Sequence, residues 1–598
     1  MFEILDRGGL GRIGRWVYDG RELRTPMVLF VHRARAPAPA FAEALLVSDR
    51  IEDPRPQIGV RGSLFAPRSP ESPWDLPPGK GLPRSVAEIE RAGSGASGAL
   101  ALLTADGDRA GAAAAEAVFL ANGPEFARDP RDFVGVLAGV REEVGPAKVV
   151  GVTGLASPAN LALLIYAGVD LAESSRVLLD GARGFFHTSD GSIPVGEADR
   201  DACGCAACAA GEDLRAHNER ALHREMLLVR NHLLHGRLRE LVERRVANDP
   251  WNTAVLRHLD LRHADLLESY TPVSGGEVLA YSHESLTRPE VVRFRARVRE
   301  RYAKPPSARV LLLLPCSARK PYSSSRSHRR FREAILASGN PSVVHEVIVT
   351  SPLGLIPREL ERFYPARAYD IPVTGDWSRD EAAMVSGDLG AYLAANPYDA
   401  VVAHLGAEAA IVQEALPQAT FTSAGRPTSD ESLANLTKVL LEVTAPFASV
   451  ARGRRFQEEM VNVARFQFGE PGRALVEGAE FRGRFPNVHV RKDGSQVAMF
   501  TERGMLSLTL EGGGILSAAD AYCIEIEDFV PKGNVFAVGV TSASPEIRVG
   551  DDVVVRHGVD VRAVGAARMN AREMTDADRG EAVHVRHAPV PAASSPLA

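Results

Sequence analysis

In the stretch LLLLPCSARKPYSSSRSH, residues 311–328, four leucines lead into a cysteine and a dense group of hydroxyl and cationic side chains. A short apolar run of this kind is typical of a buried β-strand. The residues after it are of the types that carry nucleophilic and acid–base chemistry: Cys316, Ser317, Lys320, Tyr322 and His328. The stretch therefore predicts a strand that ends at a reactive loop.

Helix-like and strand-like segments alternate on both sides of this stretch. A basic helix is expected from about residue 286, and apolar runs follow at 343–351 and 398–405. Such alternation predicts a mostly parallel sheet, in which ligands bind at the carboxyl ends of the strands. We expect residues 248–450 to form an α/β catalytic core domain.

Residues 1–247 have a similar rhythm. VVGVTG (149–154) predicts a strand, PANLALLIYAGV (158–169) predicts a helix, and residues 213–246 have sustained helical periodicity. This alternation is consistent with part of a TIM-barrel-like (β/α) domain. The segment 65–85, rich in proline and serine, predicts a long surface loop.

The sequence changes in texture after residue 450. Residues 451–518 hold short alternating runs that predict a small α+β domain. Residues 519–590 contain short strands separated by glycine turns, which are typical of a small β-barrel. The tail, 588–598, is expected to be disordered. The predicted architecture is therefore multidomain α/β with a terminal β-barrel.

Composition excludes several classes of protein. The 598 residues are 45% hydrophobic and 24% charged, with a net charge of −6, and no window is apolar enough to span a membrane. The start of the chain lacks the apolar core of a signal peptide, so we expect a cytoplasmic protein. Five cysteines in so long a chain are too few for a disulfide scaffold. Any RNA site must be a local basic patch.

Three of the cysteines form a pattern that is typical of metal sites. CGCAACAAGEDLRAHN places Cys203, Cys205, Cys208 and His217 at the spacing C-x-C-x2-C-x8-H. Thiolates at this spacing can reach one tetrahedral ion from a turn, and four protein ligands predict structural zinc. Two alternatives are three free cysteines in a loop, and His223 as the fourth ligand.

The first region resembles archaeal tRNA-guanine transglycosylases. Residues 2–31 are similar to the opening of that family, 161–175 to the segment with its catalytic aspartate, and the cysteine cluster to its zinc site. This chain has Glu173 where the family has the nucleophilic aspartate, and its first region is shorter than a full transglycosylase domain. A longer side chain is poorly placed to attack an anomeric carbon, so base exchange is disfavoured. Glu173 is expected instead to line a pocket for the modified base.

The central motifs resemble archaeosine synthases, archaeal paralogues of the transglycosylases. The similarity is carried by PCSARKPYSSSRSH (315–328), SPLGLIPREL (351–360) and YPARAYDIPVTGDW (364–377). The closing domain, 519–590, resembles a PUA RNA-binding module. The resemblance implies an archaeal enzyme that adds an amine to the nitrile of 7-cyano-7-deazaguanine at position 15 of tRNA. It also implies L-lysine as the donor and a radical-SAM partner enzyme that releases archaeosine. We expect a homo-oligomer.

A nitrile is a modest electrophile, and a free amine is mostly protonated at neutral pH. A thiolate that adds to the nitrile would give a thioimidate, which the amine then attacks. Cys316 suits this step if Lys320 or His328 lowers its pKa. His328 is also a candidate proton donor, and Tyr322 and Ser317 are candidates to orient the base or the donor.

The competing interpretation makes Cys316 a small buried residue at the end of a strand. The hydroxyls of the loop, with Arg329 and Arg330, would then hold phosphate.

An amino-acid donor needs charged partners. Arg358 is the candidate for its carboxylate, and Asp370 or Asp376 for its ammonium. The alternative for these residues is a capping or interdomain ion pair.

For the RNA module, Lys532 and Gly533 lie in a glycine turn suited to contacts with the nucleic-acid backbone. Arg548 adds positive charge, as do Arg556, Arg586 and His587. Two other functions compete with the synthase: an active base-exchange transglycosylase, and a non-catalytic RNA-binding scaffold for a partner enzyme.

Overall fold

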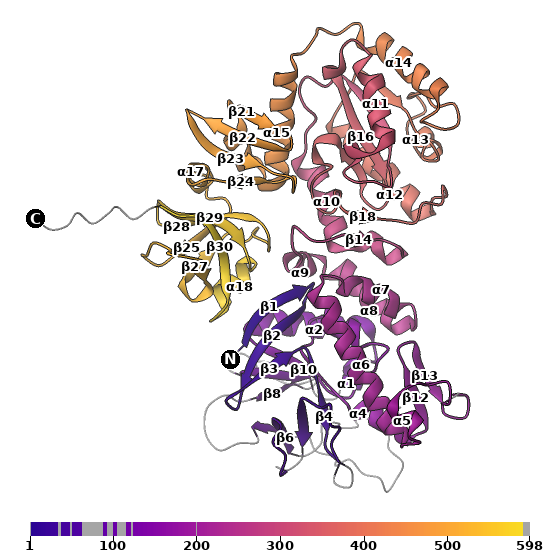
Figure 1. The fold of residues 1–598 in the computed structure, drawn as a ribbon, viewed down its shortest axis with the longest axis vertical. Helices are drawn as coiled ribbons and strands as arrows, with labels where there is room; N and C mark the ends of the chain where they lie inside the picture. Colours follow the sequence, from indigo (N-terminus) through magenta and orange to yellow (C-terminus); the bar gives the residue numbers. More distant parts are fainter. Residues whose placement is uncertain are drawn as a thin grey trace, which may run out of the picture. The chain divides into compact units, whose positions relative to one another are not determined.

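A computed structural model describes residues 2–33, 37–47, 51–61, 88–91, 100–103, 115–120, 123–198 and 200–589 (Figure 1). The chain divides into two compact units, Met1–Thr271 with Arg572–Gly580 and Pro272–Ala571 with Glu581–Ala598. The predicted loop at 65–85 lies outside the described residues, as does the predicted tail from residue 590.

The first unit contains an eight-stranded sheet of order β7-β6-β5-β4-β11-β10-β9-β8. Its strands are β4 (Met27–Val31), β5 (Ala44–Val47), β6 (Gln57–Arg61), β7 (Glu88–Arg91), β8 (Leu100–Leu103), β9 (Ala117–Leu120), β10 (Val149–Val152) and β11 (Leu171–Glu173). All neighbours are parallel except β6 and β7. The two end strands, β7 and β8, contact each other, so the sheet curves round on itself.

In the described parts of the chain, helices lie between the strands at the carboxyl-terminal end of this sheet's sequence. Helix α2 (Pro130–Val144) lies between β9 and β10, and α3 (Leu161–Tyr166) lies between β10 and β11. The predicted strand at 149–154 and helix at 158–169 are therefore confirmed, although the strand is shorter than predicted and the helix has half its predicted length. A three-stranded antiparallel sheet, β1 (Phe2–Gly8), β2 (Gly11–Tyr18) and β3 (Arg21–Thr25), precedes them.

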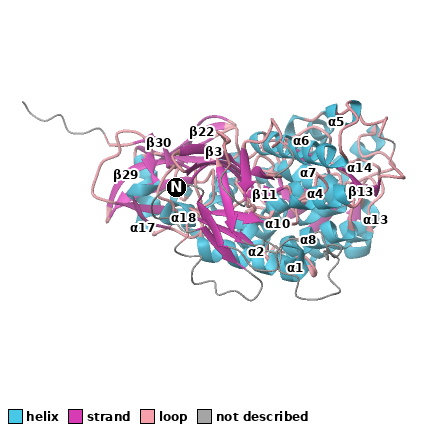
Figure 2. Ribbon diagram, turned by 90° about the horizontal axis from the view of Figure 1, so that it is seen from below, coloured by secondary structure: helices cyan, strands magenta, loops and turns pink. Residues whose placement is uncertain are grey.

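The helical periodicity predicted over 213–246 is confirmed, and two helices occupy this segment. Helix α6 (Leu214–Leu234) ends before Gly236, which has a φ of 64°, and α7 (Leu238–Val246) then begins. A left-handed residue cannot continue an α-helix, and glycine adopts this conformation without steric cost. Both helices pack against α3. Figure 2 shows α6 and α7 next to each other.

The second unit is built around a five-stranded sheet of order β17-β16-β15-β19-β20. Its strands are β15 (Val310–Pro315), β16 (Val344–Thr350), β17 (Gly354–Pro357), β19 (Ala400–Ala403) and β20 (Thr420–Phe421). Only β17 is antiparallel, at one edge. The strand predicted from the four leucines is thus the central strand of a mostly parallel sheet, as expected.

Apolar residues of β15 pack under two helices. Val310, Leu312 and Leu314 form one core with α11 (Arg326–Leu336) and α14 (Asp430–Thr444). Helix α11 begins where the side chain of Ser325 accepts a hydrogen bond from the backbone of His328, a standard N-cap. The motif loop is therefore held between a buried strand and a capped helix. Strands β14 (Val278–Leu279) and β18 (Tyr369–Asp370) form a separate parallel pair.

The remaining strands of the second unit form two further sheets, in which most neighbouring strands are antiparallel. The first contains β21 (Glu480–Arg484), β22 (Asn487–Lys492), β23 (Ser495–Phe500) and β24 (Leu506–Leu508), next to α15 (Arg452–Phe468). The second, of order β26-β30-β29-β28-β25-β27, contains β25 (Cys523–Ile526), β26 (Val535–Phe536), β27 (Val540–Ala543), β28 (Asp552–His557), β29 (Asp560–Ala567) and β30 (Glu581–His587). None of the helices in the described segments is long and apolar enough to span a bilayer.

Candidate active site

Three adjacent parallel strands end at one edge of the central sheet. A thiol, a hydroxyl or a carboxyl side chain lies at or after the end of each strand. Cys316 follows β15, Thr350 ends β16, and Glu408 lies in the loop after β19. The registers pair Pro315 with Val349 and Leu313 with Ala403, so the three chain segments leave the sheet side by side. Of these three residues, only Cys316 was predicted from the sequence. Thr350 and Glu408 are polar residues at or after apolar runs, which is a weak signal because only the fold shows which strands neighbour β15.

The side chains of Glu408, Thr350 and Lys320 lie close enough to the thiol of Cys316 to influence its pKa. Burial and the negative charge of Glu408 raise the pKa of the thiol, and they outweigh Lys320, which acts in the opposite direction. The expectation that a nearby cation gives this thiol a lowered pKa is therefore not met. Without substrate, Cys316 is therefore a protonated thiol. It must lose this proton when it attacks the substrate.

Lys320 is held by an aromatic ring. Its ammonium lies 4.1 Å from the centre of the Tyr369 ring, a cation–π contact. Burial lowers the pKa of this ammonium, while Cys316 and Asp370 act to raise it. The Tyr369 hydroxyl is itself fixed, 2.5 Å from the hydroxyl of Tyr322 and 2.6 Å from that of Thr350. Tyr322 therefore supports Lys320 and Thr350 through Tyr369.

His328 is engaged at both ring nitrogens. Arg358 lies 2.7 Å from Nδ1 and can only donate, so Nδ1 accepts, and Nε2 donates to the carbonyl of Pro315 at 3.0 Å. Burial and the charge of Arg358 lower the pKa of His328 to about 2. The ring is therefore neutral near pH 7 and positions the end of β15. Its predicted role as cation or acid is not supported by these contacts.

Arg358 is a half-buried partner of acidic residues. It donates to Glu346 at 2.6 Å and to Glu361 at 2.8 Å, in addition to its contact with His328. These contacts favour the ion-pair interpretation of Arg358 over binding of a donor carboxylate. Ser317, in turn, donates to the carbonyl of Arg319 at 3.0 Å and so shapes the loop itself.

Asp370 and Asp376 are both exposed. Asp370 ends β18 and accepts a hydrogen bond from the backbone of Ile371 at 3.0 Å. Asp376 lies in the loop beyond, where it lines a cavity of about 280 Å³. Of the predicted donor-binding residues, Asp370 lies near Lys320, Asp376 faces this cavity, and Arg358 is tied to Glu346 and Glu361.

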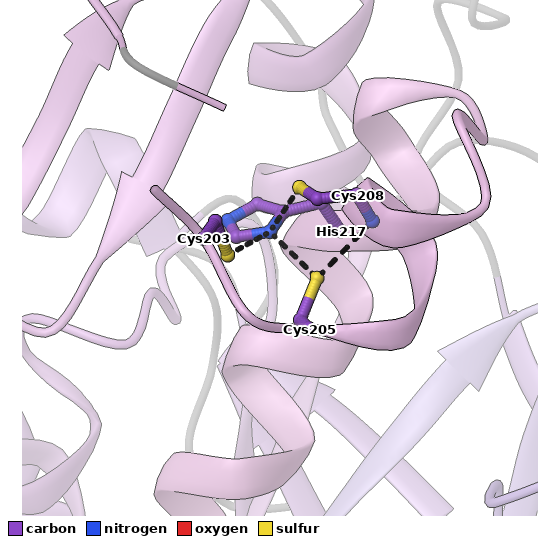
Figure 3. A group of neighbouring side chains, drawn as sticks. All are labelled: Cys203, Cys205, Cys208 and His217. Carbon is purple, nitrogen blue, oxygen red and sulfur yellow. Dashed lines mark hydrogen bonds between the residues drawn. The ribbon is translucent and has the colours of Figure 1, made fainter. Parts of the chain in front are cut away.

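The predicted metal ligands come together in the first unit. The ligand atoms of Cys203, Cys205, Cys208 and His217 all lie within 4.8 Å of one another, and Figure 3 shows these side chains pointing toward one another. Sulfur-to-Nδ1 distances are 3.6, 3.3 and 3.4 Å for the three cysteines in order. The ring nitrogen Nε2 lies 2.9 Å from the carbonyl of His187, the second-sphere contact that fixes a metal-binding histidine.

His223, the alternative fourth metal ligand, lies outside the cluster. His223 stacks on Phe41 with ring centres 4.6 Å apart and is not part of the cluster. His217 stacks on Phe186 at 3.8 Å, which holds its ring in place. Three thiols and one imidazole nitrogen, with the other nitrogen already satisfied, fit a four-coordinate structural metal.

Glu173 ends β11 and is 1% exposed. Its carboxylate accepts hydrogen bonds from the backbone of Gly154 and from the hydroxyl and backbone of Ser175, the last two at 2.6 and 2.5 Å. Burial nevertheless raises its pKa. With its oxygens occupied in this way, Glu173 braces the turns that follow β10 and β11.

Comparison with known proteins decides the family. The chain is 35% identical to archaeosine synthase subunit alpha of Methanosarcina acetivorans, over 98% of this chain and 99% of that protein. It is 39% identical to archaeosine synthase of Haloferax volcanii, over 77% of this chain and 81% of that protein. This chain belongs to the archaeosine synthase family.

More distant similarity and two domain models agree with that membership. The tRNA-guanine(15) transglycosylase of Methanothermobacter thermautotrophicus is 27% identical over 76% of this chain and 68% of that protein. A model of a domain of unknown function (DUF5591) matches residues 291–440, which include the Cys316 loop. The PUA domain model matches residues 525–589, as the resemblance of the closing domain implies.

In this PUA domain, the predicted RNA-binding residues differ in availability. Lys532 and Gly533 are exposed in the turn before β26. Arg548 donates to the carbonyl of Pro545 at 2.7 Å, which ties its guanidinium to its own loop. The other cations serve the domain itself, since Arg556 pairs with Asp520 and Glu525, and Arg586 pairs with Asp552.

Proposed function

We propose that this protein is a tRNA-modifying transferase of archaeosine biosynthesis. It would add an amine to the nitrile of 7-cyano-7-deazaguanine at position 15 of tRNA. The observation that carries the proposal is the grouping of Cys316, Lys320 and Glu408 at the carboxyl edge of the central sheet. Membership of the archaeosine synthase family and the PUA domain support tRNA as the substrate.

The chemistry needs no oxidant or reductant. The sulfur of Cys316 bonds to the nitrile carbon while its proton passes to the carboxylate of Glu408, and Glu408 returns this proton to the nitrile nitrogen to give a thioimidate. The amine then attacks the same carbon, the carbon–sulfur bond breaks, and the amine loses a proton as the thiol is restored. The net reaction is addition of one N–H across the nitrile, which yields an amidine.

Each neighbour has a distinct task in this scheme. Burial raises the pKa of Glu408, which suits a carboxyl group that must both take and return a proton near neutral pH. Lys320 stabilises the sulfur as it becomes a thiolate. Tyr369 holds Lys320 through the cation–π contact, and Thr350 holds Tyr369 through a hydrogen bond.

We further propose that L-lysine is the donor, and that a radical-SAM partner enzyme releases archaeosine from the lysine adduct. The curved sheet of the first unit is interpreted as a truncated transglycosylase barrel that has lost base exchange, since Glu173 is buried and occupied by hydrogen bonds. We expect the Cys203 cluster to hold zinc, bound by four protein ligands with no position left for substrate.

One assay separates this function from base exchange and from a scaffold. The protein is incubated with tRNA that bears the nitrile base plus L-lysine, and separately with unmodified tRNA plus free 7-cyano-7-deazaguanine. The proposal expects a mass gain in the first mixture alone. A gain in the second alone would instead support exchange, and no gain in either would support a scaffold.

The metal assignment has its own test. Elemental analysis should find one zinc per chain, and Cys208→Ser should lose it together with thermal stability, because a ligand to the ion is removed. His223→Ala, outside the cluster, should keep full zinc. Native protein without zinc, or a Cys208→Ser variant that retains it, would refute the assignment.

A further inference from the structure

The Cys316 loop and helix α11, residues 316–336, are basic although the chain as a whole is acidic. This segment holds six lysines and arginines and one carboxylate, that of Glu333, so its net charge is +5 with His328 neutral. The whole chain has a net charge of −6. A local reversal of this kind is typical of a surface that binds a polyanion. The chemistry described above uses only Lys320 among these cations.

Four of the arginines in this segment serve no acidic partner. They are Arg319, Arg326, Arg329 and Arg332, here called the arginine row, and all four are exposed. In the segments that the structure describes, none of the four forms an ion pair with a carboxylate. Their one side-chain hydrogen bond is long, 3.4 Å from Nε of Arg329 to the carbonyl of Ser325. The guanidinium groups therefore keep their donors for a ligand.

Other arginines of this domain are paired. Arg330, in the same helix, donates to the carbonyl of Thr428 at 2.5 Å and pairs with Asp430. Arg309, just before β15, makes two hydrogen bonds to Asp399, at 2.6 and 2.8 Å. The lack of acidic partners is thus a property of the arginine row and not of surface arginines in general. The structure also separates Arg329 from Arg330, which the sequence grouped as phosphate ligands.

The arginine row begins at the reactive loop. Arg319 lies three residues after Cys316 and directly before Lys320. At the start of α11, the ring of His328 donates to the carbonyl of Pro315 at 3.0 Å, so the first turn of the helix lies beside the end of β15. Residues three apart are neighbours on a helix surface, so the other members of the row follow one another along the exposed side of α11.

We propose that the arginine row binds the phosphate backbone of the tRNA on either side of the nucleotide that reacts at Cys316. The inference rests on the proposed function and adds a tRNA contact surface outside the PUA domain. A nucleotide whose base reaches the thiol brings its own phosphates with it, and the planar guanidinium fork matches a phosphate. An acidic protein would match the same charge, but it need not approach Cys316, whereas the reacting nucleotide must.

The test compares variants of the row with a paired arginine. Arg326→Gln, Arg329→Gln and the double variant remove charge from an exposed helix face, and glutamine is a helix former close to arginine, so the fold should be kept. Arg309→Gln is the matched control, because this exposed arginine lies at the opposite end of β15 and is bound to Asp399. Affinity of the full-length chain for unmodified tRNA is measured over a series of salt concentrations, and thermal unfolding checks each variant.

We expect each single variant to bind tRNA about threefold to tenfold more weakly at low salt, as loss of one charged contact predicts. The salt slope of the affinity should fall by about one charge in each single variant and by about two in the double variant. With nitrile-bearing tRNA, KM for tRNA should rise by a similar factor, whereas KM for L-lysine should stay within about twofold. Arg309→Gln should bind tRNA as native protein does.

Two results would overturn the proposal. A double variant with native affinity and native salt slope would leave the row to another partner, such as an acidic protein. A raised KM for L-lysine with unchanged tRNA binding would make the row a site for the donor carboxylate.

Phosphate ethylation interference locates the contact. Ethylation of the phosphates that flank nucleotide 15 should weaken binding to native protein and should have little further effect on the double variant. An identical interference pattern for the two proteins would also refute the assignment. Both binding measurements use unmodified tRNA and need no catalysis. Failure of the proposed function, seen as no amine addition by native protein, is therefore distinguished from failure of this surface.

Discussion

Glu173 and Cys316 occupy matching places in two different parallel sheets. One ends β11 and the other directly follows β15, both at the strand ends where α/β proteins bind ligands. The carboxylate of Glu173 is 1% exposed and accepts three hydrogen bonds from its own turns. The thiol of Cys316 instead lies near the ammonium of Lys320, the carboxyl group of Glu408 and residues that adjoin a cavity.

The difference shows that position on a sheet is not sufficient for reactivity. A side chain at the carboxyl edge can react only if its bonding capacity is not already used by the fold. Glu173 has become part of the scaffold, whereas Cys316 retains a proton to lose and groups to take it. The following predictions test this contrast, beginning with the largest expected effect.

Replacing Cys316 should have the greatest consequence. Cys316→Ala removes the nucleophile, so amine addition should fall by at least about a thousandfold, as for other covalent catalysts. Binding of tRNA and zinc content should not change, because the thiol contributes to neither. Native protein mixed with nitrile-bearing tRNA and no donor should give a covalent adduct in intact mass spectrometry. Near-native turnover by Cys316→Ala would make the thiol a packing residue and would leave direct attack by the amine.

Replacing Lys320 and replacing Glu408 should shift the pKa of the Cys316 thiol in opposite directions. Burial and Glu408 raise the pKa of Cys316, and Lys320 lowers it. Lys320→Met should therefore move alkylation of Cys316 by iodoacetamide to higher pH, and Glu408→Gln should move it to lower pH. At a pH below the pKa of the thiol, raising or lowering that pKa by one changes the thiolate fraction about tenfold. Peptide mass spectrometry at a series of pH values separates Cys316 from the other cysteines.

Catalysis should distinguish the two variants further. Lys320→Arg should recover only part of the rate, since a planar guanidinium replaces a compact ammonium. Glu408→Gln should alkylate faster yet turn over more slowly, because its amide cannot accept the thiol proton. If Glu408→Gln turned over at the native rate, another group would have to carry that proton.

Glu173 should matter for stability more than for rate. Glu173→Gln places an amide where the neighbours are all hydrogen-bond donors, which should cost about 1–3 kcal/mol in the free energy of unfolding. Amine addition should remain within about tenfold of native, a change of about 1.4 kcal/mol. A covalent adduct of tRNA through Glu173 would contradict the contrast with Cys316.

The pH dependence of stability provides a second readout at this residue. Burial raises the pKa of Glu173 in the folded state above its unfolded value. Its contribution to stability is therefore fully present below the unfolded pKa and is lost as pH rises through the folded pKa. Denaturation curves of Glu173→Gln should lack this component, whereas those of Cys316→Ala should retain it.

Much of this arrangement was open to prediction from local patterns. The apolar run before Cys316 predicted a buried strand, and the spacing of Cys203, Cys205, Cys208 and His217 predicted a cluster that the fold assembles. Both signals lie within short segments. The sequence alone did not reveal Thr350 and Glu408, because their role depends on which strands neighbour β15 in the sheet.

Burial accounts for the remaining differences. His328 and Arg358 have the chemical character of catalytic groups, yet each is engaged by the other and by further buried partners. The pKa of His328 falls to about 2 only because its ring is enclosed beside a guanidinium. No pattern in the motif indicates that enclosure, since it arises from the packing of β16 and the turn after β17.

The smallest effect is expected at the PUA domain, where single contacts to the nucleic-acid backbone are weak. Deleting the domain is a poor test, because Tyr522 donates to the carbonyl of Gln467 at 2.8 Å and Asp552 accepts from the backbone of Leu508 at 2.8 Å. Truncation from residue 519 would thus remove part of the neighbouring packing.

Lys532→Ala, at an exposed turn, should instead weaken tRNA binding a few-fold and reduce the salt dependence of the affinity by about one charge. Arg556→Ala is the matched control: this cation is already paired with Asp520 and Glu525, so it should alter stability more than the salt slope. Equal salt slopes for Lys532→Ala and native protein would place the RNA contact elsewhere on the domain.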